Sequence, residues 1–109
     1  MNEKTLENKI KEHLKKNGHF HFKFFANALT KTGVPDIIAC INGRFVGIEV
    51  KNPNGKGVVS PLQKLTCDEI NKQGGKAIIV DNFDKYLKFY EEVIKDVRNV
   101  LWWHYMAKN

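Results

Sequence analysis

Arginine and cysteine are both scarce in this chain. Arg44 and Arg98 are the only arginines, so lysine supplies almost all of the positive charge. Because arginine is the side chain that most often reads guanine, this scarcity argues against base-specific recognition of nucleic acid. The two cysteines, Cys40 and Cys67, have the spacing of neither a metal site nor a redox motif. Each lies in an apolar-periodic segment, so we expect buried free thiols, which fit a reducing cytoplasm.

Long apolar runs are also lacking. No stretch reaches the roughly 20 apolar residues that a membrane-spanning helix needs, and the polar residues 1–4 give no sign of a secretory signal. The chain has 109 residues, of which 42% are hydrophobic and 28% charged. We therefore expect a single cytoplasmic domain over residues 1–109, with an aromatic tail at residues 102–109.

The positive charge favours a polyanionic partner. The formal net charge is +6 and the isoelectric point is about 9.4. A positive surface attracts nucleic acid and gains sequence-independent affinity by releasing counterions. The alternative is a charge that only keeps the protein in solution, and the charge by itself does not decide between the two.

Hydrophobic periodicity and turn residues predict seven elements in the order α-β-β-β-α-β-α. The expected helices cover residues 3–16, 60–73 and 83–101, and the expected strands cover residues 19–24, 36–41, 44–51 and 76–80. This order indicates the α/β class, with one mixed sheet and helices packed against it.

A predicted hairpin brings two acids together. Asn42-Gly43 is the favoured pair for a type I′ turn between two strands. Counting outward from that turn along both strands places Asp36 directly opposite Glu49. Opposed residues point to the same side, with Cβ atoms ~4.5–5.5 Å apart, and Lys51 shares that side because it lies two residues beyond Glu49.

Two acids in this position need a compensating cation. Like charges directly opposite each other destabilise a sheet, and a divalent cation suits carboxylate oxygens. Mg²⁺ between Asp36 and Glu49 would keep water molecules for chemistry, while Lys51 could orient the attacking water or stabilise charge on a phosphate. The alternative is a solvated end of the sheet where Lys51 alone neutralises both acids.

Two further polar side chains are expected near the acids. Glu7 lies at the border of the apolar stripe of the first helix, so it is either an ordinary flanking residue or another carboxylate for the metal or its water shell. Ser60 and Gln63 form a capping box at the start of the second helix, and Pro61 suits its first turn. Gln63 therefore has a structural role whether or not it also reaches the site.

These residues resemble a known nuclease motif. The run Gly-Val-Pro-Asp ending at Asp36, followed by Glu-Val-Lys ending at Lys51, is similar to the split Pro-Asp…(Asp/Glu)-x-Lys motif of the restriction-endonuclease-like nucleases. Glu7 on the first helix and the Ser-x-x-Gln of Ser60 and Gln63 make the closest resemblance one to the virus-type replication-repair nucleases (VRR-NUC), in particular small stand-alone phage members. The resemblance covers residues 7–90 approximately.

The resemblance implies a restriction-endonuclease-like fold and a deoxyribonuclease that depends on Mg²⁺ or Mn²⁺. It assigns metal binding to Asp36, Glu49 and the carbonyl of Val50, and supporting roles to Glu7 and Gln63. The lysine of the motif would position the attacking water. Small members look like Holliday-junction resolvases and are expected to be homodimers. The implied substrate is therefore branched or duplex DNA in the cytoplasm of a phage host, with no nucleotide cofactor.

Two other functions remain open from the sequence. The first is a basic DNA-binding accessory protein without catalysis, which would bind DNA without cleaving it when Mg²⁺ or Mn²⁺ is present. The second is a metal-dependent phosphatase or nucleotidase, which would turn over free nucleotides with little sensitivity to salt. A nuclease that contacts several phosphates should instead weaken steeply with salt.

Some other conspicuous residues carry weaker signals. Lys23 and Lys56 are candidate contacts to the substrate backbone, although Lys56 is as easily explained as a solubilising lysine in a Gly-flanked loop. His19 and His21 could share a metal, but no third ligand is evident, and a solvated strand face is expected. The aromatic tail at residues 102–109 is expected to cap the core or to form a dimer interface rather than to stack on bases.

Overall fold

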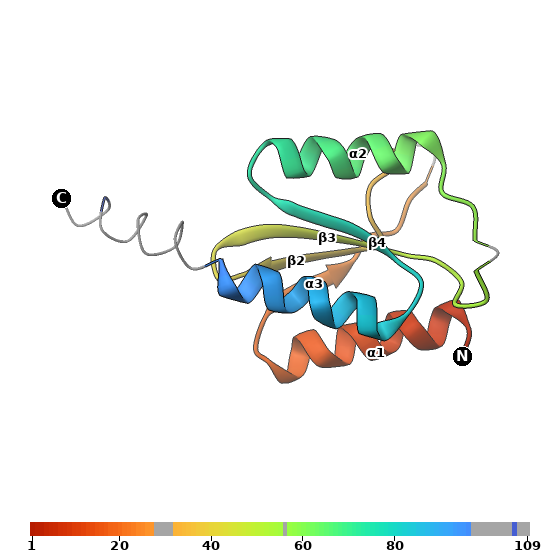
Figure 1. Cartoon of the computed structure of the whole chain (residues 1–109), viewed down its shortest axis with the longest axis horizontal. Helices are drawn as coiled ribbons and strands as arrows, with labels where there is room; N and C mark the ends of the chain where they lie inside the picture. Colours follow the sequence, from red (N-terminus) through yellow and green to blue (C-terminus); the bar gives the residue numbers. More distant parts are fainter. Residues whose placement is uncertain (28–31, 56, 97–105, 107–109) are drawn as a thin grey trace.

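A computed structural model shows one four-stranded sheet with helices on both of its faces (Figure 1). The structure describes residues 1–27, 32–55, 57–96 and 106. Its elements, in chain order, are α1 (Glu3–Lys16), β1 (Phe20–Lys23), β2 (Ile37–Ile41), β3 (Arg44–Val50), α2 (Pro61–Lys72), β4 (Lys76–Val80) and α3 (Phe83–Lys95). The expected α/β class and element order are confirmed.

The sheet is mixed, as predicted, in the order β1-β2-β3-β4. β1, β2 and β3 form an antiparallel meander, and β4 pairs parallel to β3. A parallel pair needs a long crossover connection, and α2 supplies it. The crossover between β3 and β4 therefore places α2 on one face of the sheet, and α1 and α3 lie on the opposite face (Figure 1).

The hairpin between β2 and β3 has the predicted turn and register. Asn42 has a φ of 51° and Gly43 a φ of 80°. Both central residues of a type I′ turn require positive φ, which asparagine tolerates and glycine adopts freely. The pairing then runs outward to Ile37 opposite Ile48, as counted from the sequence.

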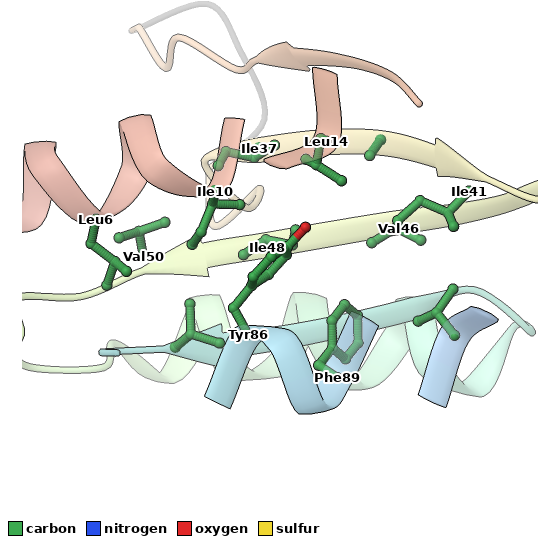
Figure 2. Packing of buried hydrophobic residues seen from close by; sticks show 13 residues of the cluster. Leu6, Ile10, Leu14, Ile37, Ile41, Val46, Ile48, Val50, Tyr86 and Phe89 are labelled. Atoms are coloured by element: carbon green, nitrogen blue, oxygen red, sulfur yellow. The ribbon is translucent and has the colours of Figure 1, made fainter. Parts of the chain in front are cut away.

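The main hydrophobic core lies between the sheet and the helices α1 and α3 (Figure 2). Leu6, Ile10 and Leu14 recur every four residues along α1, so they form one stripe, and all three are fully buried. Tyr86 of α3 is also fully buried, and it belongs to the same core cluster as Ile48 of β3 (Figure 2). Burying each such side chain stabilises the fold by roughly 1.5–3 kcal/mol.

α2 packs closely on the opposite face, over β3 and β4. A Cβ atom on Gly47 of β3 would lie 2.8 Å from Cγ of Pro35, and one on Gly75 would lie 2.7 Å from Cγ2 of Ile70 in α2. Both distances are shorter than van der Waals contact, so a larger residue at either glycine would displace its neighbour. This close packing holds Pro35, just before β2, and the helix α2 against the sheet.

The other half of that face, formed by β1 and β2, is only partly covered. Phe20, Cys40 and Phe45 pair side by side across three strands. Phe20 is 73% exposed and Phe45 is 51% exposed. Cys40 is exposed as well, so the expectation that both thiols are buried is wrong for Cys40 and confirmed for Cys67. The reason is that Cys67 lies on the side of α2 that is buried against the sheet, whereas the contacts of α2 are mainly with β3 and β4 rather than with β2, which carries Cys40.

Several element boundaries differ from the prediction. β1 covers Phe20–Lys23 rather than residues 19–24, and its ladder with β2 runs from the pair Phe20–Cys40 to the pair Lys23–Ile37. α3 ends at Lys95 rather than at Leu101, and Asp96 has a non-helical ψ of 64°. The aromatic tail with Trp102 and Trp103, which was expected at residues 102–109, lies outside the described residues except for residue 106.

No helix in the described part of the chain combines the length and the apolar composition needed to cross a membrane.

Candidate active site

Asp36 and Glu49 meet at the end of the β2–β3 hairpin. Asp36 immediately precedes β2, and Glu49 lies one residue before the end of β3, one position beyond the pair of Ile37 with Ile48. The carboxylate of Asp36 accepts a hydrogen bond of 3.0 Å at Oδ2 from the backbone N–H of Val50. This bond ties the side chain of Asp36 to the end of β3, where Glu49 lies.

The environment of Glu49 disfavours its charged form. Its side chain is almost fully removed from water, with the residue 3% exposed. The pKa of Glu49 is raised to about 7, mainly by burial and next by the carboxylate of Asp36, while the ammonium of Lys51 acts to lower it. Near neutral pH the carboxyl pair therefore holds a proton for part of the time, and a cation that binds the pair must displace it.

The side-chain amide of Gln63 makes two hydrogen bonds, one to an oxygen of Glu49 and one to the start of α2. Its Nε2 donates a hydrogen bond of 2.8 Å to Oε2 of Glu49. Its Oε1 accepts from the backbone N–H of Ser60 at 3.2 Å, while Ser60 Oγ accepts from the backbone N–H of Gln63 at 3.1 Å. The predicted capping box is confirmed, and the amide of Gln63 also reaches the acid pair.

The other oxygen of Glu49 has no hydrogen-bond partner. Oε1 is buried, and no donor of the described residues reaches it. A buried carboxylate oxygen without a partner costs free energy, unless a proton shared with Asp36 or a bound cation satisfies it. Carboxylate oxygens of Asp36 and Glu49 are the ligands that a hard divalent cation prefers, so the residues present fit Mg²⁺ or Mn²⁺.

The protein side of such a site is small. Among the described residues, no three side chains of His, Cys, Asp or Glu gather into a group that could hold a metal ion. The two carboxylates would therefore share the metal with water and with the predicted carbonyl ligand of Val50. A Mg²⁺ ion suits this arrangement, because it gives up its water molecules reluctantly and is usually held by one or two carboxylates.

Lys51 is held next to the acid pair. Its Nζ lies 3.8 Å from Oε2 of Glu49, and its side chain is 16% exposed. Its backbone N–H donates to the carbonyl of Val80 in β4 at 2.8 Å. The loop that follows β3 then folds back on it, since a Cβ atom on Gly57 would lie 3.1 Å from Cβ of Lys51. Lys56 in the same loop lies outside the described residues.

Glu7 lies beside the site but does not join the acid pair as a third carboxylate. It is nearly buried on α1, and its Oε1 accepts from Nζ of Lys23. Burial works to raise the pKa of Glu7, but the ammonium groups of Lys23 and Lys11 outweigh it and hold that pKa below its ordinary value. Lys23 also lies 3.7 Å from Oδ1 of Asp36, Nζ to oxygen, so it links Glu7 to the site.

Sequence reasoning missed two lysines and misjudged one histidine. Lys4 and Lys11 both pair with Glu7, and their spacing of three and four residues from it along a helix is the signal that indicates the contact. His19 is not on a solvated strand face, because its Nε2 lies 2.7 Å from the hydroxyl of Tyr90 in α3.

Comparisons with models of protein families, with curated proteins and with solved structures found no match to this chain. The resemblance to the VRR-NUC nucleases therefore stays a prediction from the motif.

Proposed function

We propose that the protein is a nuclease of the VRR-NUC type that hydrolyses phosphodiester bonds in DNA with Mg²⁺ or Mn²⁺. The observation that carries the proposal is the state of Glu49. This carboxyl group is buried against Asp36 and has one oxygen without a hydrogen-bond partner. An arrangement that costs stability in the protein alone is typical of a site built for a ligand.

The chain's own residues supply positioning and charge. Asp36 and Glu49 would hold the metal, which when bound acts as a Lewis acid and lowers the pKa of water. Lys51 would orient the attacking water or stabilise the negative charge that develops on the phosphate. Gln63 fixes the carboxylate of Glu49 through the 2.8 Å hydrogen bond, as groups around a metal ligand commonly do.

The charge of the chain supports a polymeric substrate rather than a free nucleotide. A net charge of +6, carried mostly by lysine, gives affinity for many phosphates at once. Two arginines in the whole chain leave little capacity for reading bases, so cleavage would depend on the shape of the DNA rather than on its sequence. Branched DNA, including the four-way junction, is the substrate that the resemblance favours.

We also propose that two copies pair through the uncovered half of the sheet. The exposed phenylalanines Phe20, Phe22 and Phe45 lie on one face of β1 and β3, on either side of Cys40 and Ile38. A buried aromatic side chain removes about 150–250 Å² from water, so these three expose on the order of 300 Å². That is a large part of the roughly 800 Å² that each partner buries in a standard interface. A pair of sites could then cut both strands of one branched DNA.

Cleavage assays test the proposal. The purified protein is incubated with linear, nicked, flapped and four-way-junction DNA, in Mn²⁺ or in EDTA, beside Asp36→Ala and Lys51→Ala. We expect cleavage by the wild type in Mn²⁺ alone and none by either variant. Equal cleavage by all three proteins would overturn the proposal, because it would indicate a contaminating enzyme. Binding without cleavage would instead indicate an accessory DNA-binding protein, and turnover of free nucleotides a phosphatase.

A further inference from the structure

Three lysines converge on one buried carboxylate beside the proposed site. Nζ of Lys4 lies 3.4 Å and Nζ of Lys11 3.3 Å from Oε2 of Glu7, and both lysines belong to the same helix, α1. Lys23 of β1 binds Oε1 of the same carboxylate. The side chain of Glu7 is 6% exposed. We refer to Glu7, Lys4, Lys11 and Lys23 as the Glu7 cluster.

The Glu7 cluster contains more positive charge than its one carboxylate neutralises. One ammonium group neutralises one carboxylate, and Lys23 already binds Glu7. Lys4 and Lys11 place two more positive charges on the second oxygen, where like charges at short range repel each other. The side chain of Lys4 is 71% exposed and well solvated, but that of Lys11 is only 28% exposed. An anion placed between these two lysines would relieve the repulsion.

The same lysines keep hydrogen-bond donors for such an anion. An ammonium group has three N–H donors, and one carboxylate oxygen accepts one of them. Lys4 and Lys11 both direct a donor to Oε2 of Glu7, so the shared carboxylate holds the two ammonium groups close together. Further donors on each group can then converge on one phosphate, in charge-assisted hydrogen bonds of the strong kind.

The Glu7 cluster adjoins the acid pair. Nζ of Lys23 lies 3.7 Å from Oδ1 of Asp36, so one lysine belongs to both groups. A phosphate bound at Lys4 and Lys11 would therefore lie on the protein surface near Asp36.

We propose that the Glu7 cluster binds a phosphate group of the nucleic-acid backbone next to the one that is cleaved. This assignment rests on the proposed nuclease function, and it names the part of the surface that positions the strand. Lysines that contact phosphate fix the register of a protein on a nucleic acid but carry no sequence information. Glu7 serves here as the anchor that keeps the lysines together rather than as a metal ligand.

Binding measurements in EDTA test the assignment without cleavage. The affinity of a fluorescein-labelled DNA is measured by anisotropy over a range of salt concentrations, for the wild type and for the double variant Lys4→Gln, Lys11→Gln. The matched control is Lys15→Gln, Lys88→Gln, which removes the same charge from exposed positions of α1 and α3. We expect the Lys4/Lys11 variant to bind about tenfold more weakly, with the salt slope reduced by about 1, and the control to lose clearly less.

Equal losses in the two double variants would overturn the assignment, because the lysines would then act only through net charge. A second measurement uses the unaltered protein. DNA should protect Lys4 and Lys11 from amine acylation, as detected by mass spectrometry, more than it protects Lys15 and Lys88, and equal protection would contradict the assignment. These outcomes are separate from catalysis: a protein that binds in this way but never cleaves DNA refutes the nuclease function and leaves the phosphate site standing.

Discussion

The amide of Gln63 donates a hydrogen bond of 2.8 Å to Oε2 of Glu49, while Oε1 of the same carboxylate is buried without a partner. Gln63 thus binds one of the two oxygens and leaves the other for a ligand. The same amide also caps α2, so the position of this helix and the orientation of Glu49 depend on one side chain. The proposed metal site is therefore coupled to the packing of α2 on the sheet.

The two roles of Gln63 can be separated by a pair of variants. Ser60→Ala removes the capping hydroxyl and keeps the bond to Glu49, so we expect a loss of about 1 kcal/mol in unfolding free energy and an unchanged cleavage rate. Gln63→Leu also removes the bond to Glu49, and we expect cleavage to fall by about 10- to 100-fold. Denaturant unfolding and single-turnover cleavage measure the two effects. Equal cleavage by both variants would show that the bond to Glu49 has no role at the site.

The carboxyl group of Glu49 should destabilise the metal-free protein at alkaline pH. Its pKa is about 7 in the fold against an ordinary value of 4.5, so the folded state binds more protons than the unfolded state between these values. The stabilising contribution of the protonated form is complete below pH 4.5 and is lost as the pH rises through 7.

Glu49→Gln, which cannot ionise, should therefore gain stability relative to the wild type as the pH rises. We expect a gain on the order of 2 kcal/mol between about pH 5 and about pH 8. Urea unfolding in EDTA at the two values measures it, with Asp84→Asn at the exposed start of α3 as the control. A constant difference between variant and wild type would show that Glu49 titrates normally.

Two histidines should make the fold sensitive to acid in the opposite direction. Burial lowers the pKa of His13 and of His19, and each ring contacts a tyrosine hydroxyl of α3, on Tyr86 and Tyr90 respectively. The unfolded state then binds more protons near the ordinary value of 6.5, so their contribution to stability is present above that pH and is lost as the pH falls below it.

The variant His13→Gln, His19→Gln should lose this pH dependence. Its unfolding free energy is compared with that of the wild type between about pH 8 and about pH 5. We expect the wild type to lose more stability than the variant on acidification. Parallel curves for the two proteins would contradict the contribution assigned to these histidines.

If the exposed aromatic face is the dimer interface, a charge placed on it should convert the dimer into a monomer. Phe45→Glu places a charge on the exposed aromatic face, and burying it in an interface would be costly. We expect sedimentation to show a dimer for the wild type and a monomer for the variant, with the helical circular dichroism unchanged. Val58→Glu, at an exposed position in the loop after β3, is the control and should remain a dimer. A monomeric wild type would contradict the proposed dimer.

The sequence predicted the features that depend on local chemistry. Asn42 and Gly43 determine the turn, and the turn determines the register, so the position of Asp36 opposite Glu49 could be counted without a structure. The capping box of Ser60 and Gln63 is equally local. All of these depend on residues fewer than 20 positions apart.

The sequence could not predict features that depend on how the layers meet. The unpartnered Oε1 of Glu49 and the hydrogen bond from Gln63 to Oε2 depend on the packing of α2 against β3. Sequence periodicity does not specify that packing, and only the resemblance to the nuclease motif placed Gln63 near the acids. The exposure of Cys40 follows from the part of the sheet that α2 leaves open. The pairing of Lys23 with Glu7 joins a strand to a helix, and so depends on the packing of α1 against β1.

Uptake of Mn²⁺ tests most directly whether Asp36 and Glu49 form a metal site. The free ion is followed by electron paramagnetic resonance while the protein is titrated without DNA. We predict that the wild type and Ser60→Ala bind Mn²⁺, and that Asp36→Asn and Glu49→Gln do not, although all four remain folded. Equal uptake by the wild type and by both acid variants, or no uptake by any of them, would contradict the account.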